Sequence, residues 1–344
     1  MGYILGIDQG WTNTRAAVMD GSGNVLGYRR ADGSYFPRVG IDAAMQCAMA
    51  AAEGALEDAG ADAGGISAIV AGITGIDYEG DELVVVGALR ERFGDKQIIA
   101  CNDCEIAYYS GSAKPVGAVV CAGTGINAAI YAPGGGKFVM GDYLKASLQG
   151  GSAIARRAIE AVFESEVGMW PETRLTQLFC GATGDPTVTK LLQRFIADGS
   201  FQRKLGSHAP AVIALADDGD VVAQGVLEAF SDELCACVAA AMKKMGILEL
   251  GCDIVLAGSV FKGRVNGLTC MVAEKLARSA RNASIVNAAY EPVVGACIMG
   301  MAQTAGGFGE RMARNAAASA ARLGLARQAP PLMRAHRHSD HRHQ

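Results

Sequence analysis

The feature that most constrains this chain is a strand–turn–strand pattern at residues 4–18. Apolar residues lead up to Asp8, the turn carries Gly10, Thr12 and Asn13, and apolar residues resume after it. A turn of small residues lets backbone N–H groups and hydroxyls approach phosphate oxygens, and a carboxylate at a strand end can hold a hydrated Mg²⁺. Asp8 is therefore a candidate metal ligand, acting through water. A plain β-hairpin turn is the alternative.

The same geometry recurs later in the chain. Gly123, Thr124 and Gly125 lie between two apolar runs, and a third apolar strand ends at Gly258 and Ser259. Ligands of open α/β sheets bind beyond the ends of strands, so three such turns predict a nucleotide site. The repeat also indicates a duplicated architecture with phosphate held between two halves.

Composition limits the class of protein. The chain has 344 residues, enough for two ordinary domains, and half of these residues are hydrophobic. The formal net charge of −4 is spread along the chain, so we expect no nucleic-acid partner. No apolar run reaches the roughly 18–20 residues of a membrane span, and no signal sequence precedes the first strand. We expect a cytoplasmic protein that does not associate with membranes.

The order of predicted elements indicates a mixed-sheet α/β fold. Three strands come first, helices and strands alternate up to about residue 101, and the second half opens with a strand pair at 116–132. We expect an N-terminal domain at 1–115, a C-terminal domain at 116–305 with a helical insertion at 150–250, and an Ala/Arg/His-rich tail at 306–344. The expected elements are strands at 3–8, 14–19, 25–30, 66–73, 97–101 and 137–140, and a strand that runs into a glycine turn within 253–261. Helices are expected at 41–59, 80–93, 264–280 and 291–304, the last of these expected to pack back on the N-terminal domain.

Cysteines and histidines give weaker signals. Only Cys101 and Cys104 among ten cysteines form a CxxC pair, and no second pair stands at ligand spacing, so buried thiols are favoured over a redox or metal half-site. Four of the five histidines lie at 336–343, where a solvated tail without fixed structure is favoured over a metal-binding tract.

A candidate base follows the strand at 97–101. Asn102 and Asp103 stand where this strand ends and a helix begins, at the sheet edge that Asp8 should also occupy. A carboxylate there could accept the proton of an attacking hydroxyl during phosphoryl transfer. The alternative is that Asp103 only caps its helix.

Five motifs in this order resemble the N-acetylglucosamine kinase branch of the BadF/BadG/BcrA/BcrD ATPase family, within the actin-like ATPase and sugar-kinase superfamily. The resemblance runs from residue 3 to about 304 and implies two ribonuclease H-like domains, each with a mixed five-stranded sheet, and a cleft between them. The motifs are Ile4–Val18, Asn102-Asp103, Ala122–Asn127, Gly150–Ala153 and Ala257–Phe261.

The resemblance assigns roles to individual residues. It implies that ATP and Mg²⁺ are the cofactors, that Asp103 is the catalytic base, and that Gly258 and Ser259 border the adenosine. The first phosphate loop would consist of Asp8, Gly10, Thr12 and Asn13, the second of Gly123, Thr124 and Gly125, and the sugar site of Asn102, Asp103, Thr124, Asn127, Gln149 and Ser152.

Two residues depart from the family pattern. Trp11 stands where the first loop normally has glycine, so its side chain either points away from phosphate or alters the approach of the nucleotide. Gln149 stands where kinases of this branch usually have an aspartate that binds sugar hydroxyls. An amide donates as well as accepts hydrogen bonds, so the pattern of hydroxyls that it recognises should differ.

Three functions remain open at this point. The first is an ATP-dependent kinase that phosphorylates the 6-hydroxyl of an amino sugar, N-acetylglucosamine or glucosamine. The second is an ATPase that activates a partner redox enzyme, whose family resemblance rests on Cys121 before the second turn. The third is a sugar sensor that has lost phosphate transfer. The Gly/Ala-rich helices between 218 and 245 would allow a homodimer, although a helical core is the more frequent outcome.

Overall fold

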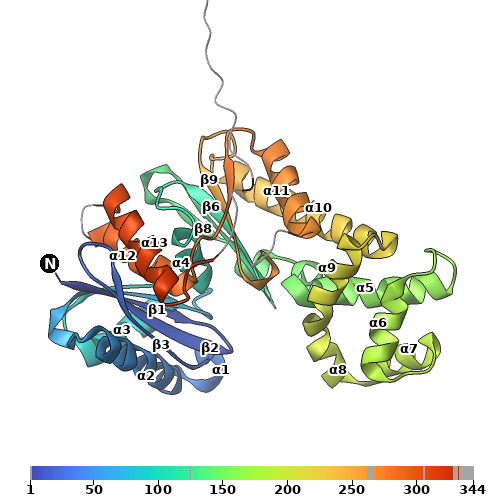
Figure 1. Ribbon diagram of the computed structural model, residues 1–344, viewed down its shortest axis with the longest axis horizontal. Coiled ribbons are helices and arrows are strands. Elements are labelled where there is room, and N and C mark those ends of the chain that lie inside the picture. Colours follow the sequence, from blue (N-terminus) through green and yellow to red (C-terminus); the bar gives the residue numbers. More distant parts are fainter. Residues whose placement is uncertain (1, 124, 262–265, 305–306, 328–331, 333–344) are drawn as a thin grey trace, which may run out of the picture. The chain divides into compact units, whose positions relative to one another are not determined.

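The computed structural model describes residues 2–123, 125–261, 266–304, 307–327 and 332 (Figure 1). These residues form two compact units. Unit 1 comprises the described residues of 1–119 and 287–329, and unit 2 comprises those of 120–286 together with residue 332. The chain therefore leaves unit 1 after its fifth strand and returns to it for its last helices.

Unit 1 is built on a five-stranded sheet with the strand order β3-β2-β1-β4-β5. The pairs β1–β2 and β2–β3 are antiparallel, whereas β1–β4 and β4–β5 are parallel. The carboxyl ends of three neighbouring strands thus meet at one edge of the sheet. The strands are β1 (Tyr3–Gln9), β2 (Asn13–Met19), β3 (Val25–Asp32), β4 (Ile66–Ile73) and β5 (Gln97–Cys101).

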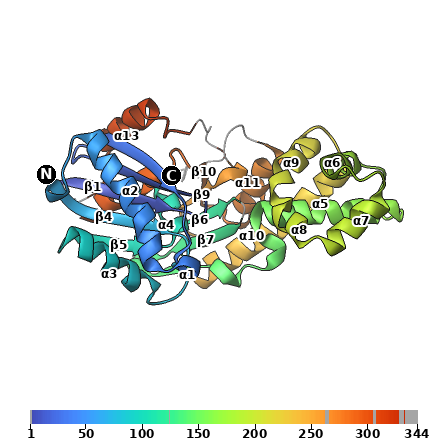
Figure 2. The same cartoon turned by 90° about the horizontal axis from the view of Figure 1, so that it is seen from below.

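Helices cover both faces of this sheet, which explains why β1 is buried almost throughout. Leu5 and Ile7 join the core under α2 (Ile41–Ala59), which runs across the strands in Figure 2. On the other face, a Cβ atom added to Gly6 would lie 2.8 Å from the carbonyl oxygen of Val293 in α12 (Pro292–Thr304). Because successive side chains of a strand point to opposite faces, β1 carries apolar or very small residues from Ile4 to Ile7.

The remaining helices of unit 1 are α1 (Phe36–Val39), α3 (Asp81–Phe93), α4 (Asp103–Tyr109) and α13 (Glu310–Arg322). The last of these lies in the segment expected to be a tail. It docks beside β3, where Ser319 Oγ accepts a hydrogen bond of 2.9 Å from Val25 N and Asn315 Nδ2 donates one of 2.8 Å to Ser22 O. The histidines at 336–343 lie outside the described residues.

Unit 2 combines a second five-stranded sheet, ordered β10-β9-β6-β7-β8, with a long helical segment. Its strands are β6 (Gly117–Ala122), β7 (Ile126–Tyr131), β8 (Lys137–Val139), β9 (Asp253–Ala257) and β10 (Ser284–Asn287). Its helices are α5 (Gly150–Glu166), α6 (Arg174–Thr183), α7 (Val188–Ala197), α8 (Gly199–Lys204), α9 (Ala209–Asp217), α10 (Val221–Lys244) and α11 (Gly267–Ser279).

Two five-stranded sheets in an α/β chain confirm the predicted fold class. The division of the chain differs from the expected one, because unit 1 extends to Val119 and includes α13. It also includes α12, the helix that was expected to pack there. The expected strand that runs into a glycine turn is β9, which ends at Ala257, and Gly258 with a φ of +94° turns the chain. Among the described residues, no helix is both long and apolar enough to cross a bilayer.

Candidate active site

Asp8 and Asp103 lie at the same edge of the unit 1 sheet. The strand register aligns Asp8 with Gly72 of β4, and Gly72 with Cys101 of β5, so one row of residues crosses the three parallel strands. Asp103 follows Cys101 by two residues and opens α4. The predicted convergence of the two carboxylates is therefore present, and the charge of Asp103 contributes to the pKa of Asp8.

Asp8 is a buried carboxylate with one cationic partner. Arg15 stands opposite it on β2, and its Nη1 donates a hydrogen bond of 3.2 Å to Asp8 Oδ2. Burial raises the pKa of Asp8 to about 6, the guanidinium of Arg15 opposes this rise, and the nearby negative charge of Asp103 adds to it. Asp8 thus changes its charge within the neutral range.

Asp103 is not the cap of its helix. Asn102 takes that position, with its Oδ1 accepting from Cys104 N at 3.0 Å and Glu105 completing a capping box. Because Asn102 caps α4, the carboxylate of Asp103 is left to other partners. Thr74 Oγ1 donates to Asp103 Oδ2 at 2.5 Å, and burial raises the pKa of Asp103 against the lowering effect of this bond.

Asn102 is committed to the protein rather than exposed for a ligand. Besides capping α4, its Nδ2 donates to Ile76 O at 3.0 Å and to Asp77 Oδ1 at 2.9 Å. Its side chain is buried, so it fixes the loop after β4 next to the start of α4. We infer that Asn102 acts on a substrate through the position of Asp103.

The first turn is a closed hairpin. Gly10 N donates to Asn13 O at 2.9 Å, so this N–H group is already used within the turn. Asn13 Nδ2 donates to Thr12 Oγ1 at 3.1 Å, and Arg30 donates to the Oδ1 of Asn13. The ring of Trp11 stacks on a neighbouring tyrosine, which places it against unit 1's own surface.

The residues of this edge fit a hydrated Mg²⁺. Such an ion takes one or two carboxylates and keeps several waters or phosphate oxygens as ligands. Asp8 supplies a carboxylate at the strand end, and within the described part of the chain no group of three or more His, Cys, Asp or Glu side chains could hold a metal ion. A magnesium ion here would depend on Asp8, water and the phosphates of a nucleotide.

In unit 2 the predicted glycine turns meet. Gly151 N donates to Gly123 O at 2.8 Å, and Gly123 N donates to Gly125 O at 2.8 Å. A Cβ atom on Gly150 would lie 2.2 Å from Gly125 O, and one on Gly258 would lie 2.2 Å from Ala122 O. Only glycine permits these approaches, because both residues also have positive φ angles. Thr124 lies outside the described residues.

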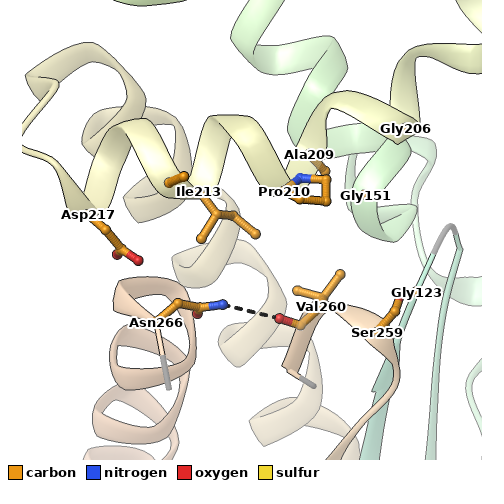
Figure 3. A pocket seen from close by; sticks show the side chains of 11 residues that line it. Gly123, Gly151, Gly206, Ala209, Pro210, Ile213, Asp217, Ser259, Val260 and Asn266 are labelled. Atoms are coloured by element: carbon orange, nitrogen blue, oxygen red, sulfur yellow. Dashed lines mark hydrogen bonds between the residues drawn. The ribbon is translucent and has the colours of Figure 1, made fainter. Parts of the chain in front are cut away.

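A cavity of about 320 Å³ opens beside these turns (Figure 3). Helix α9 forms one wall, Val260 faces it, and Asp217 and Asn266 stand at the end away from Gly123. Asp217 Oδ1 accepts a hydrogen bond of 2.8 Å from Gly267 N, which ties α9 to the start of α11. The cavity is lined by Gly123, Gly151, Gly206, Ala209, Pro210, Ile213, Ala214, Asp217, Ser259, Val260 and Asn266.

The cavity suits a nucleoside with its phosphates at the glycine end. Its walls are apolar, its polar groups are few, and the first turn of α5 adds the positive end of a helix dipole at Gly151. Ser259 lines the cavity, and Gly258 turns the chain before it. Their contact with adenosine stays a prediction.

The remaining predicted sugar residues of unit 2 surround the same turns. Gln149 Nε2 donates to Leu144 O at 3.4 Å, and a Cβ atom on Gly125 would lie 3.6 Å from Gln149 Oε1. Asn127 Oδ1 accepts from Gly141 N at 2.8 Å and so supports the neighbouring loop. Ser152 Oγ lies beside Gly206, on the side of the cavity.

Sequence reasoning missed several groups of these sites. Thr74 follows an apolar strand and precedes Gly75, the same pattern that marked the other turns, so it could have been found. Arg15 lies one hairpin away from Asp8, and counting residues across the turn would have paired them. Asp217 and Asn266 carry no comparable signal, because only the tertiary fold brings α9 to the start of α11.

One protein family and several solved structures are similar to this chain. The model of the BadF/BadG/BcrA/BcrD ATPase family matches residues 5–300. No protein with a curated description matches the chain significantly.

Several solved structures with the same fold carry the names of sugar kinases. The structure of a candidate N-acetylglucosamine kinase from Chromobacterium violaceum matches with a TM-score of 0.62 and 20% identity, over 87% of this chain and 99% of that one. A similar candidate from Porphyromonas gingivalis gives 0.59 and 17%, over 87% and 98%. A ROK family glucokinase from Streptomyces griseus in complex with glucose and AMPPNP gives 0.54 and 17%, over 86% and 98%. At these identities the likeness establishes the fold.

Proposed function

The chain belongs to the BadF/BadG/BcrA/BcrD ATPase family, and we propose that it is an ATP-dependent kinase that phosphorylates the 6-hydroxyl group of an amino sugar. N-acetylglucosamine and glucosamine are the proposed acceptors. The observation that carries the proposal is the environment of Asp103. Its carboxylate accepts hydrogen bonds from Thr74 Oγ1 and from backbone N–H groups at the start of α4, and burial raises its pKa against their lowering effect.

Asp103 acts as the base in the proposed reaction. It orients the 6-hydroxyl group and accepts its proton while the oxygen attacks the γ-phosphorus of ATP. The new O–P bond replaces the bond from the γ-phosphorus to the bridging oxygen, which leaves with ADP. Because a general base works best with a pKa near the working pH, the raised pKa of Asp103 favours this role.

Asp8 has a different proposed task. Its carboxylate would hold a hydrated Mg²⁺. The bound ion would neutralise part of the negative charge of the ATP phosphates. Arg15 keeps the Asp8 side chain in place through its hydrogen bond, and it limits the rise in the pKa of Asp8 that burial causes.

Unit 2 is the proposed nucleotide holder. The cavity takes the adenosine next to Ser259, and Gly123 and Gly125 approach the phosphates with their backbone. Thr124 belongs to the same proposed loop, and Gln149, Asn127 and Ser152 are proposed sugar contacts around it. The amide of Gln149 would select a hydroxyl pattern that differs from the one an aspartate selects.

The test is a screen for ADP release over N-acetylglucosamine, glucosamine, N-acetylmannosamine and glucose, with Mg²⁺-ATP present. ADP release that depends on an amino sugar, with a 6-phosphate product by mass spectrometry and NMR, supports the kinase. ADP release that no sugar changes would instead indicate the ATPase that activates a redox partner. Saturable sugar binding without ADP release would indicate the sensor.

A further inference from the structure

Trp11 is a conspicuous residue that the proposed reaction leaves unused. Its side chain is 54% exposed, so core packing does not account for it. It stacks on Tyr35 with the ring centroids 4.6 Å apart and the planes 27° from parallel. Two aromatic rings thus present a continuous apolar surface at the tip of the first turn.

This aromatic pair is fixed by the backbone around it. A Cβ atom on Gly33 would lie 2.2 Å from the carbonyl carbon of Thr12, so only glycine lets the segment before Tyr35 press against the turn. Ser34 N also donates to Gly10 O at 3.1 Å. The close contact at Gly33 and the hydrogen bond from Ser34 to Gly10 therefore hold the two rings in place, in addition to the stacking between them.

The pair adjoins the catalytic edge of unit 1. A Cβ atom on Gly75 would lie 3.0 Å from Tyr35 Cε2, and Gly75 directly follows Thr74. Thr74 in turn holds the carboxylate of Asp103. The aromatic pair and the proposed base therefore lie on segments of unit 1 that contact each other at the same edge of the sheet.

We propose that Trp11 and Tyr35 form a stacking wall of the acceptor site, on which the C–H face of the acceptor pyranose packs. This inference rests on the proposed kinase function. A pyranose presents hydroxyls around its rim and C–H groups on its faces, so it needs polar partners for the first and apolar area for the second. Aromatic rings supply such area with little loss of side-chain entropy, and specific pockets combine them with a few placed polar groups.

The wall assigns a role to the residue that departs from the family pattern. The family's usual glycine would remove the indole ring and leave only the ring of Tyr35 for this packing. Trp11 therefore acts on the affinity for the acceptor, whereas a residue of the phosphate loop would act on the affinity for ATP. The two assignments differ in which Michaelis constant responds to substitution.

Kinetics of Trp11→Gly and Trp11→Phe test this distinction. For the sugar phosphorylated in the screen, we expect Trp11→Gly to raise the acceptor KM about tenfold, from lost apolar contact, and to leave kcat and the KM for ATP within about twofold. Trp11→Phe keeps a ring and should raise the acceptor KM only about threefold. An increase in the KM for ATP with an unchanged acceptor KM would overturn the wall.

The matched control is Trp170→Phe. Trp170 lies in unit 2, is 42% exposed, and donates from Nε1 to Glu164 at 2.8 Å. It has no part in either site, so both Michaelis constants should stay at their parent values. Thermal unfolding of each variant checks that the changes in KM do not come from loss of fold.

Fluorescence separates the wall from the reaction. The chain has two tryptophans, so Trp170→Phe leaves Trp11 as the single reporter. N-acetylglucosamine or glucosamine, whichever is phosphorylated, should change its emission saturably, with half-saturation near the KM. An active Trp170→Phe enzyme whose emission does not respond would refute the wall and leave the kinase standing. If no sugar yields ADP, the kinase fails, and the wall is then decided by the same titration with both sugars.

Discussion

The strand edge of unit 1 and the cavity of unit 2 are built from different kinds of residue. The edge carries ionisable and hydroxyl side chains on adjoining elements, with Asp8 paired to Arg15 and Asp103 bonded to Thr74. The cavity is built from glycine backbone and one face of α9, and the one ionisable group among its described lining residues, Asp217, stands at the far end. Ionisable side chains can take up and release protons, whereas glycine backbone and apolar side chains can only bind a ligand and define the shape of its site. The difference supports the proposal that unit 1 performs the chemistry and unit 2 holds the nucleotide.

Removing the base should have the largest effect. Asp103→Asn keeps the size of the side chain and a partner for Thr74, but an amide cannot accept the proton of the hydroxyl. We expect kcat to fall by about 10²- to 10⁴-fold, the usual range for a general base, while binding of an ATP analogue survives. Steady-state kinetics and calorimetry measure the two quantities.

Asp95→Asn is the matched control for this change. Asp95 is an exposed carboxylate in the same unit, between α3 and β5, and its removal should leave kcat unchanged. Near-normal turnover in Asp103→Asn would show that the strand edge does not supply the base, and the contrast between the two units would lose its chemical meaning.

The glycine construction of unit 2 predicts a second effect. Gly258→Ala places a Cβ atom 2.2 Å from Ala122 O at a φ of +94°, so the variant combines backbone strain with a clash. We expect a loss of about 2–4 kcal/mol in the free energy of unfolding, together with weaker nucleotide binding. Denaturant unfolding and nucleotide titration would measure these changes.

Gly246→Ala separates the effect of backbone strain from the effect of the clash. Gly246 has a φ of +73°, and no atom lies within 4 Å of the position that a Cβ atom would take there, so the variant carries the strain without the clash. It should cost only about 1 kcal/mol and leave nucleotide binding unchanged. Equal losses in both variants would mean that the close approach at Gly258 contributes nothing.

The same contrast explains what the sequence could reveal. Asp8 and Asp103 were predictable because each ends a strand, and parallel neighbours bring strand ends together. Gly123 and Ser259 were predictable for the same reason. The wall made by α9 was not, because Pro210 and Ile213 look like ordinary helix residues until the fold sets them opposite Val260.

Helix α13 shows a second limit. Its buried seam consists of Ala316, Ser319 and Ala320, residues too small or too polar to give a clear hydrophobic stripe. The sequence therefore predicts a tail, whereas the hydrogen bond between Ser319 and Val25 binds the helix to unit 1. Polar contacts between segments about three hundred residues apart leave no local pattern to read.

The pH dependence of activity should follow unit 1. Burial raises the pKa of Asp8 to about 6, so its charged form grows from about a tenth at pH 5 to about nine tenths at pH 7. Activity should therefore rise about tenfold over this interval if the charged form of Asp8 is required. A kcat/KM profile for ATP measures the rise, and a flat profile between pH 5 and 7 would remove Asp8 from the mechanism.

The contribution of Asp8 to the free energy of unfolding should fall as pH rises, opposite to the activity. Because the pKa of Asp8 is higher in the folded state than the ordinary aspartate value of 3.8, the folded state binds more protons between pH 3.8 and about 6. The contribution of Asp8 to stability therefore falls as pH rises through this window and stays low above it. Asp8→Asn should gain stability relative to the parent when the two are compared at pH 7 rather than pH 4, by thermal unfolding. A relative loss at pH 7 would contradict a pKa of Asp8 that burial raises despite the charge of Arg15.

The smallest expected effect comes from Asp217, the carboxylate among the described lining residues of the cavity. Asp217→Asn keeps an oxygen that can accept from Gly267 N, and it removes only the charge. If unit 2 binds the nucleotide by shape and backbone, the KM for ATP should change by less than about threefold, because an exposed charge interacts weakly through water. A tenfold change in the KM for ATP would mean that Asp217 accepts a hydrogen bond from the nucleoside. Unit 2 would then recognise its ligand through a charged side chain, as unit 1 does.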